Sequence, residues 1–213
     1  MKVVVIDYGS GNLRSCAKAF ERAAVEHKIN ADIIVSSKTE DILSADRIVL
    51  PGVGAFADCR AGLDAIPGLV DAMNEAVIKN GKPFFGICVG MQLMADVGRE
   101  FGDTKGLGWV GGEVVAMHPD DKNLKIPHMG WNDLKIKNPH PLVEGLPVGG
   151  HVYFVHSYQF VVSDKKNIVA EIDYGGAVVA IIAKDNMVGT QFHPEKSQKF
   201  GIGIIANFLS WNP

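Results

Sequence analysis

Cys88 is the residue whose surroundings point most directly to chemistry. It lies between Gly86 and Gly90 in the run Gly-Ile-Cys-Val-Gly. The residues Pro83–Ile87 before it predict a strand, and apolar positions at helical spacing over Met91–Val97 predict a helix after it. A nucleophile flanked by glycines on a sharp strand-to-helix turn is the nucleophile-elbow pattern, here with cysteine in place of serine. The start of a helix also favours the thiolate, which is the reactive form of the side chain.

A thiolate that attacks an acyl group needs a partner base, and His193 is the best placed of the seven histidines. It directly follows an apolar run that predicts a strand, and Pro194 prevents that strand from continuing. The turn brings Glu195 back toward the imidazole, so that Glu195 accepts from one ring nitrogen and the other faces the thiol, as in a catalytic triad. The remaining histidines lack the spacing of metal ligands, so we expect no metal site and interpret them as surface or hydrogen-bonded residues: His27, His118, His128, His140, His151 and His156.

A glycine-bearing run, Pro-Gly-Val-Gly-Ala-Phe, follows the predicted strand Arg47–Leu50. Attack on an amide creates an oxyanion that backbone N–H groups must stabilise, and glycine lets the backbone approach a ligand closely. In isolation the run is typical of an ordinary strand-to-helix loop. Beside the predicted elbow it becomes the expected oxyanion loop, with the N–H groups of Val53 and Val89 as donors.

Composition and charge restrict the class of protein. The chain has 213 residues, of which 47% are hydrophobic, so we predict one domain over residues 1–213. A net charge of -3 gives no basic surface for nucleic acid or anionic lipid, and no apolar run approaches the roughly 20 residues that span a bilayer. Cys16 and Cys59 lie in predicted helices and are interpreted as core residues. Three cysteines without a CxxC pair argue against disulfides and favour a reducing cytoplasm.

The elements that must position these residues change character along the chain. In the first half, predicted strands alternate with predicted helices, which indicates βαβ units and a parallel sheet: strands Lys2–Asp7, Asp32–Ser36, Arg47–Leu50 and Pro83–Ile87, and helices Asn12–Ala24, Ala55–Leu63 and Leu69–Asn80. The second half is rich in strands separated by short turns: Trp109–Met117, Asn132–Ile136, His151–Phe154, Gln159–Val162, Ile168–Asp173, Ala177–Lys184 and Met187–Phe192, before a last helix, Phe200–Leu209. We therefore predict an α/β fold with a mostly parallel central sheet flanked by helices, and an additional antiparallel β-rich part.

The three motifs, in this order, resemble the class I or triad glutamine amidotransferases over essentially the whole chain, and these have a flavodoxin-like fold. The resemblance implies that Cys88 attacks the side-chain amide of glutamine to form a γ-glutamyl thioester, that His193 moves the proton, and that water then releases glutamate. It also implies that the glutamine is held by Gly52, Gln92, Ser157 and Tyr158. No GxxxxGK[ST] loop is present for ATP, and we expect no cofactor.

Five segments narrow the resemblance to the glutaminase subunits of imidazole glycerol phosphate synthase in histidine biosynthesis: residues 7–12, 51–56, 127–132, 153–158 and 193–197. In that group a separate (βα)8-barrel cyclase subunit uses the ammonia to make imidazole glycerol phosphate and AICAR. The resemblance implies a heterodimer with Asn12, Met129, Trp131 and Lys196 at the interface. By size and apolarity alone, Met129 and Trp131 would be expected in the core.

One position departs from the pattern of that group, because Gln159 stands where a second aromatic residue is expected. A glutaminase with nothing to aminate would waste glutamine. We therefore expect the Val53 N–H to point away from the oxyanion until the partner is occupied.

Three alternatives remain open. The first is the glutaminase subunit of another amidotransferase, such as anthranilate synthase or pyridoxal phosphate synthase. Residues 127–132 and Lys196 argue against it. A γ-glutamyl hydrolase that acts alone is a second alternative. A catalytically silent regulatory subunit is the third, and the intact set of Cys88, His193 and Glu195 disfavours it.

Overall fold

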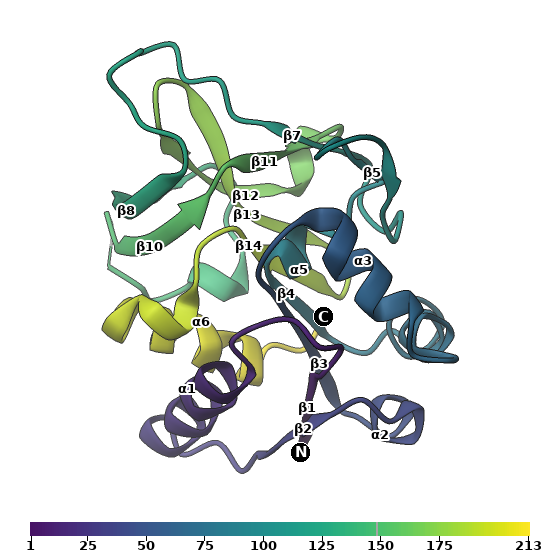
Figure 1. Ribbon diagram of the computed structural model, residues 1–213. Coiled ribbons are helices and arrows are strands. Elements are labelled where there is room, and N and C mark those ends of the chain that lie inside the picture. The colour runs from purple at the N-terminus through teal and green to yellow at the C-terminus, as the bar shows by residue number, and fades with distance from the viewer. Residues whose placement is uncertain (148) are drawn as a thin grey trace.

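An eight-stranded sheet in the order β2-β1-β3-β4-β14-β13-β12-β9 runs through the computed structural model, which describes residues 1–147 and 149–213 (Figure 1). The first five strands in this order are parallel: β2 (Asp32–Ser36), β1 (Lys2–Ile6), β3 (Arg47–Gly52), β4 (Phe84–Cys88) and β14 (Met187–Thr190). The last three are antiparallel: β13 (Ala177–Lys184), β12 (Ile168–Asp173) and β9 (Lys135–Ile136). The predicted α/β fold class, with a mostly parallel sheet and an antiparallel part, is confirmed.

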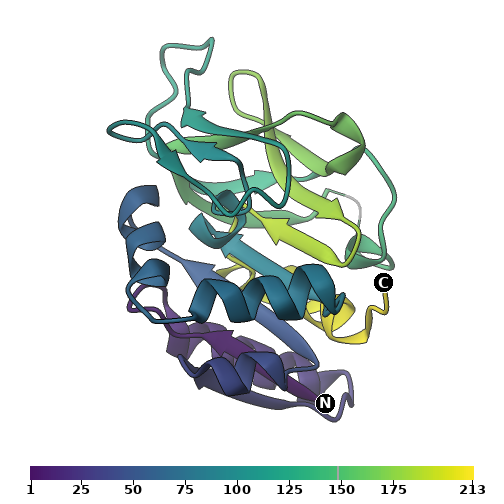
Figure 2. The same cartoon turned by 90° about the vertical axis from the view of Figure 1, so that its right-hand side faces the viewer.

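Two smaller sheets extend the antiparallel half, which lies above the parallel half in Figure 2. One is a pair of antiparallel strands, β8 (His128–Asp133) and β10 (His151–His156). The other has the order β11-β7-β5-β6 and consists of β11 (Tyr158–Val162), β7 (Gly112–Ala116), β5 (Val97–Gly98) and β6 (Thr104–Lys105). The turn between β10 and β11 therefore joins these two sheets at residue 157.

Helices cover both faces of the parallel strands. The helical segments are α1 (Leu13–Glu26), α2 (Thr39–Leu43), α3 (Phe56–Asp64), α4 (Leu69–Met73), the π-helical η1 (Asn74–Lys79), α5 (Val89–Gln92), the short 3-10 turns η2 (Pro141–Val143), η3 (Lys165–Asn167) and η4 (Pro194–Lys196), and α6 (Gln198–Ser210). Among these residues no helix is long and apolar enough to cross a membrane.

Two adjacent phenylalanines on β4 pack into the two opposite layers, because successive side chains of a strand point to opposite faces. The Phe85 ring lies 5.1 Å from Phe208 of α6 and 6.2 Å from Phe20 of α1, between centroids. On the other face, Phe84 meets Trp109 edge-on at 4.9 Å. All five side chains are at most 5% exposed, so the strand that carries Cys88 is fixed from both sides.

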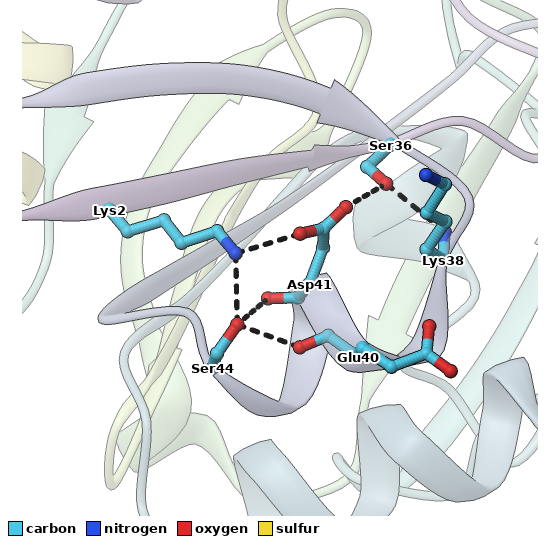
Figure 3. Close-up of polar contacts among 6 residues, drawn as sticks. All are labelled: Lys2, Ser36, Lys38, Glu40, Asp41 and Ser44. Atoms are coloured by element: carbon cyan, nitrogen blue, oxygen red, sulfur yellow. Dashed lines mark hydrogen bonds and ion pairs between the residues drawn. The ribbon is translucent and has the colours of Figure 1, made fainter.

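A polar cluster ties α2 to the edge of the sheet (Figure 3). Lys2 Nζ lies 2.8 Å from Asp41 Oδ1 and donates to Ser44 Oγ at 2.9 Å. Ser36 Oγ, at the end of β2, donates to the other carboxylate oxygen of Asp41 at 2.6 Å. The helix over Thr39–Leu43 was not predicted from the sequence, because it has only five residues and its position depends on these contacts with distant strands.

Several boundaries differ from those predicted. The predicted helix Leu69–Asn80 is α4 followed by the π-helical η1, and the predicted strand Asn132–Ile136 is divided between the ends of β8 and β9. The strand predicted from Trp109 begins only at Gly112, because the Trp109 and Val110 N–H groups donate to the Met94 carbonyl instead of to a neighbouring strand.

Candidate active site

Cys88 ends β4 and directly precedes α5, as the sequence predicted, with φ 55° and ψ -113°. A positive φ at a residue other than glycine costs on the order of 1–3 kcal/mol, and such residues gather at functional sites. Cys88 pairs with Gly52 at the end of β3, and Gly86 pairs with Gly189 on β14. The cysteine therefore lies at the carboxyl ends of the parallel strands, where ligands bind in sheets of this kind.

Three glycines make the turn at Cys88 sterically possible. A Cβ atom on Gly86 would lie 2.6 Å from the Gly90 carbonyl oxygen, and one on Gly52 would lie 2.8 Å from the Gly90 nitrogen. A Cβ atom on Gly90 itself would overlap the Leu50 carbonyl oxygen. The backbones of β3, β4 and α5 thus touch directly, which explains the glycine on each side of Cys88.

The helix predicted over Met91–Val97 is wrong, because α5 is a single turn over Val89–Gln92. The carbonyls that would continue it are used by a neighbouring loop: Leu107 N–H donates to Leu93 O at 2.7 Å, and Gly108 N–H to Ala95 O at 3.0 Å. The dipole of one turn is small, so the helix contributes less to the thiolate than the sequence suggested. Val89 nevertheless opens this turn, so its N–H has no partner within the helix.

His193 follows β14 and faces Glu195 across the 3-10 turn η4. The His193 Nδ1 atom lies 2.8 Å from Glu195 Oε1, and the two side chains are 3% and 4% exposed. The main chain of His193 is fixed by Tyr153 of β10, whose carbonyl accepts its N–H at 3.0 Å, and by Ser197 Oγ, which donates to its carbonyl at 2.7 Å. His193 Nε2 has no hydrogen-bond partner among the described residues. Nδ1 thus carries the proton toward Glu195, and Nε2 is left for the chemistry.

The electrostatic surroundings of His193 favour its charged form. Burial is the strongest single influence and disfavours the imidazolium, but the Cys88 sulfur as thiolate and the Glu195 carboxylate outweigh it and raise the pKa of His193 to about 9. A raised pKa means that the imidazolium is present below pH 9 and is lost above it. The His193 imidazolium is therefore available as a proton donor at neutral pH.

Replacing Glu195 by glutamine is expected to move the alkaline limb of kcat/KM for the glutaminase reaction expected from the sequence below pH 9, because one of the groups that raise the His193 pKa is lost. Above this limb His193 has no proton to give to a leaving group. Glu195→Asp keeps the charge and serves as the matched control, with its limb closer to pH 9. The same alkaline limb in the parent and Glu195→Gln would contradict this assignment.

A cavity of about 270 Å³ opens beside the sulfur and brings most of the predicted site residues together: Val53, Cys88, Val89, Gln92, Ser157, Tyr158 and His193 all line it. Two predicted residues are not among the lining residues: Gly52, which pairs with Cys88, and Glu195, which contacts His193 Nδ1. Glu100, Pro127, Val155 and His156 also line the cavity and were not predicted from the sequence. Glu100 accepts the Phe56 N–H at 2.8 Å, so it also fixes the start of α3.

Gln191 is the functional candidate that sequence reasoning missed. Its side chain is fully buried, and its Nε2 lies 3.7 Å from Cys88 Sγ. Gln92 Nε2 donates to Gln191 Oε1 at 3.0 Å and to the Tyr158 carbonyl at 3.2 Å. The available signal was an amide side chain directly after β14, two positions before His193.

Two further histidines lie buried at the side of the cavity. His156 Nδ1 lies 2.9 Å from the Tyr158 carbonyl and must donate to it, so His156 Nε2 accepts from His128 Nδ1 at 3.1 Å. Burial lowers the pKa of each to about 4, which keeps both neutral near pH 7. The expectation of hydrogen-bonded histidines is confirmed for this pair, which joins β8 to β10.

Ser10 holds the loop that the sequence predicts to be the oxyanion loop. The Val53 N–H donates to Ser10 Oγ at 3.3 Å, while Ser10 Oγ donates to the Val53 carbonyl at 2.6 Å. Cys59 Sγ also donates to this carbonyl, at 3.4 Å. The Val53 N–H is therefore engaged by the Ser10 side chain in this conformation.

The four residues matched to an interface lie outside the cavity. Met129 and Trp131 are 62% and 47% exposed, so the burial expected from their size is wrong. Lys196 is exposed, with Nζ 5.8 Å from the centre of the Tyr153 ring, and Tyr153 packs edge-on against Trp131 at 5.8 Å. Asn12 is also exposed, at the start of α1. No group of three or more His, Cys, Asp or Glu residues that could hold a metal ion occurs within residues 1–147 and 149–213.

Comparison with known proteins gives matches over the whole chain. The family model described as "Glutamine amidotransferase class-I" matches residues 4–210. Proteins named "Imidazole glycerol phosphate synthase subunit HisH" are 56% identical in Brucella suis and 57% identical in Rhizobium meliloti, each over 216 residues that cover 100% of both chains. The protein of the same name from Rhodospirillum rubrum is 56% identical over 214 residues, again with 100% of both chains covered.

Solved structures share the fold at lower sequence identity. A crystal structure described as a glutamine amidotransferase superposes with a TM-score of 0.71 at 18% identity, and covers 98% of this chain and 99% of its own. The crystal structure of another glutamine amidotransferase, from Thermotoga maritima, gives a TM-score of 0.63 at 18% identity, with 92% and 76% covered.

Proposed function

The chain belongs to the class I glutamine amidotransferase family, and we propose that within this family it is the glutaminase subunit of imidazole glycerol phosphate synthase. It hydrolyses glutamine to glutamate and ammonia for histidine biosynthesis. The observation that carries the proposal is the placement of Cys88 at a strained turn beside a buried His193–Glu195 pair, in a chain 56% identical over its full length to proteins of that name. Residues 1–213 act as one glutamine amidotransferase domain.

The geometry supports a double-displacement mechanism. The Cys88 thiolate attacks the side-chain carbonyl carbon of glutamine, and the N–H groups of Val53 and Val89 stabilise the oxyanion that forms. The His193 imidazolium then donates its Nε2 proton to the departing ammonia, which leaves a γ-glutamyl thioester and a neutral imidazole. Neutral His193 next takes a proton from water, which attacks the thioester. Glutamate departs, and the thiolate–imidazolium pair is restored.

The glutamine is held by residues that surround the sulfur. Gln92, Ser157 and Tyr158 line the cavity together with Cys88, and Gly52 pairs with Cys88 at the end of β3. Supporting this assignment, the cavity of about 270 Å³ is large enough for one amino-acid side chain, and His193 and Val155 are also among its lining residues. Glutamine binding orients its amide toward the thiolate, which replaces a bimolecular encounter by a positioned one.

The partner is a (βα)8-barrel cyclase subunit that converts a ribotide and ammonia to imidazole glycerol phosphate and AICAR. The exposed apolar side chains of Met129 and Trp131, beside Lys196 and close to the strand that anchors His193, support a docking face there, and Asn12 extends it to the start of α1. The compartment is the cytoplasm, which suits an enzyme with a reactive thiol and three free cysteines.

Partner occupancy releases the oxyanion loop. With its N–H on Ser10 Oγ at 3.3 Å, Val53 contributes no donor to the oxyanion, so the isolated chain is expected to be slow. Removal of a single oxyanion donor typically costs roughly 10²–10³ in rate. Rotation of the Val53 peptide in the complex restores this donor.

The Ser10→Ala variant is expected to hydrolyse glutamine faster than the parent in the absence of the partner, by about tenfold or more, since the Val53 N–H loses its competing acceptor. Ser37→Ala, at an exposed serine directly after β2, is the matched control and should leave the rate unchanged. A partner-free rate in Ser10→Ala equal to that of the parent would contradict the role of Ser10.

The proposed function is tested by glutamate release from glutamine, measured with the purified chain alone and with the cyclase subunit plus its ribotide substrate. A low rate that rises steeply in the complex is the expected result. If the chain hydrolyses glutamine well alone and the cyclase changes nothing, the glutaminase assignment holds and the histidine-pathway assignment is wrong. No glutamate under either condition would favour a silent regulatory subunit.

A further inference from the structure

The buried amide of Gln191 touches the catalytic sulfur, and no step of the mechanism above uses it. Its Nε2 lies 3.7 Å from Cys88 Sγ, and its side chain is fully buried. The main chain of Gln191 is fixed by a 2.9 Å hydrogen bond from its N–H to the Ala180 carbonyl of β13. The amide therefore approaches the sulfur from the sheet, whereas His193 approaches it from the turn after β14.

A single backbone carbonyl determines which end of the Gln191 amide faces the sulfur. The Tyr158 carbonyl can only accept, so the end of Gln92 that lies 3.2 Å from it must be the NH₂ group. The same NH₂ group lies 3.0 Å from Gln191, which must present its oxygen there. The remaining end of the Gln191 amide is NH₂, and this end faces Cys88. No other orientation of the Gln92 and Gln191 amides satisfies the hydrogen bonds between Tyr158, Gln92 and Gln191.

We propose that Gln191 is a positioning residue that donates a hydrogen bond to Cys88 Sγ and thereby favours and aims the thiolate. The inference rests on the proposed function of Cys88 as nucleophile. A thiolate accepts a hydrogen bond more strongly than a neutral thiol, since bonds to an ionised partner are roughly twice as strong. The donor is fixed before substrate arrives, so it requires no reorganisation during the reaction.

Gln191 supplies stabilisation of the Cys88 thiolate that the short helix after Cys88 does not. One turn of helix gives a weak dipole, so the thiolate depends on specific groups around it. His193 provides a charge on one side, and Gln191 provides a dipole on the other. Loss of the Gln191 amide leaves Gln92 bonded to the Tyr158 carbonyl, but it removes the acceptor of the second Gln92 N–H, so each variant must be checked for folding.

The test is the pH dependence of Cys88 alkylation by iodoacetamide in the isolated full-length chain, without glutamine. Gln191→Leu removes the donor, and Gln191→Glu keeps an acceptor for Gln92 but places a carboxylate beside the sulfur. Peptide mapping by mass spectrometry assigns the adduct to Cys88, since Cys16 and Cys59 are also free and are both buried. Circular dichroism verifies that each variant is folded.

We expect alkylation of Gln191→Leu at pH 7 to be about tenfold slower than in the parent, with the midpoint of the pH profile at higher pH. Gln191→Glu is expected to shift the midpoint further in the same direction. If folded Gln191→Leu gives the profile of the parent, the proposal is wrong. If Gln191→Leu does not fold, the same comparison applies to Gln191→Glu.

The alkylation assay and the glutamate-release assay distinguish failure of the Gln191 proposal from failure of the proposed function. A parent chain that alkylates readily at Cys88, with the expected change in the variants, but releases no glutamate in the complex would refute the glutaminase assignment and leave the hydrogen bond intact. Normal glutamate release together with an unchanged alkylation profile would refute only the role of Gln191.

Discussion

Replacing Cys88 by alanine is expected to reduce glutamine-dependent formation of imidazole glycerol phosphate by at least roughly 10³-fold in the complex, because no other group can form the thioester. Alanine removes the sulfur and leaves the turn in place, so the variant should still fold and bind the partner. The measurement is product formation by the complex with glutamine as the nitrogen source.

The control for Cys88→Ala is the same assay with ammonium salt in place of glutamine. Ammonia from solution bypasses the glutaminase reaction, so the complex with Cys88→Ala should then turn over like the parent complex. Equal loss with both nitrogen sources would indicate that the substitution damages the complex. Unchanged turnover with glutamine would favour the silent regulatory subunit over an enzyme.

The Gly90→Ala substitution is expected to have the largest effect on stability, lowering the free energy of unfolding by about 3 kcal/mol or more. The new Cβ atom would overlap the Leu50 carbonyl oxygen on β3, which is a backbone atom, so rotation of a side chain cannot relieve the overlap. For a domain of this length the unfolding midpoint should fall by roughly 6–12 °C.

A second glycine provides the matched control for Gly90→Ala. A Cβ atom on Gly111 would lie 3.8 Å from the nearest atoms of Ser163, which is an ordinary contact, so Gly111→Ala should change the midpoint little. Thermal unfolding followed by circular dichroism compares the two variants. A Gly90→Ala protein as stable as Gly111→Ala would contradict the tight packing of the elbow.

The parts of the site that follow from local sequence were predictable. Glycines on both sides of Cys88 and the proline after His193 act on the backbone within a few residues, and the apolar runs before them determine two parallel strands. Because parallel strands end at the same edge of a sheet, the two motifs meet there although they are distant in sequence. Chain order and turn chemistry thus sufficed to bring Cys88, His193 and Glu195 together.

The remaining features depend on contacts that no local pattern encodes. The helix after Cys88 does not continue past Gln92, and the loop around Leu107 and Gly108 bonds the next carbonyls, those of Leu93 and Ala95. Gln191 faces the sulfur only because β14 is paired to both β4 and β13. Met129 is exposed although its size and apolarity predict burial. The end of the helix and the position of Gln191 depend on hydrogen bonds between segments that are distant in sequence. The exposure of Met129 depends on which surface the rest of the fold leaves uncovered.

The central claim is that glutamine is hydrolysed through a covalent intermediate on Cys88, and the most direct test is to capture it. The complex with its ribotide ligand is mixed with glutamine, quenched in acid during turnover, and analysed by intact mass and peptide mapping. The account predicts a γ-glutamyl group on the peptide that contains Cys88, absent in Cys88→Ala and lost on longer incubation as glutamate appears. Steady release of glutamate with the Cys88 peptide never modified, or modified at another residue, would contradict it.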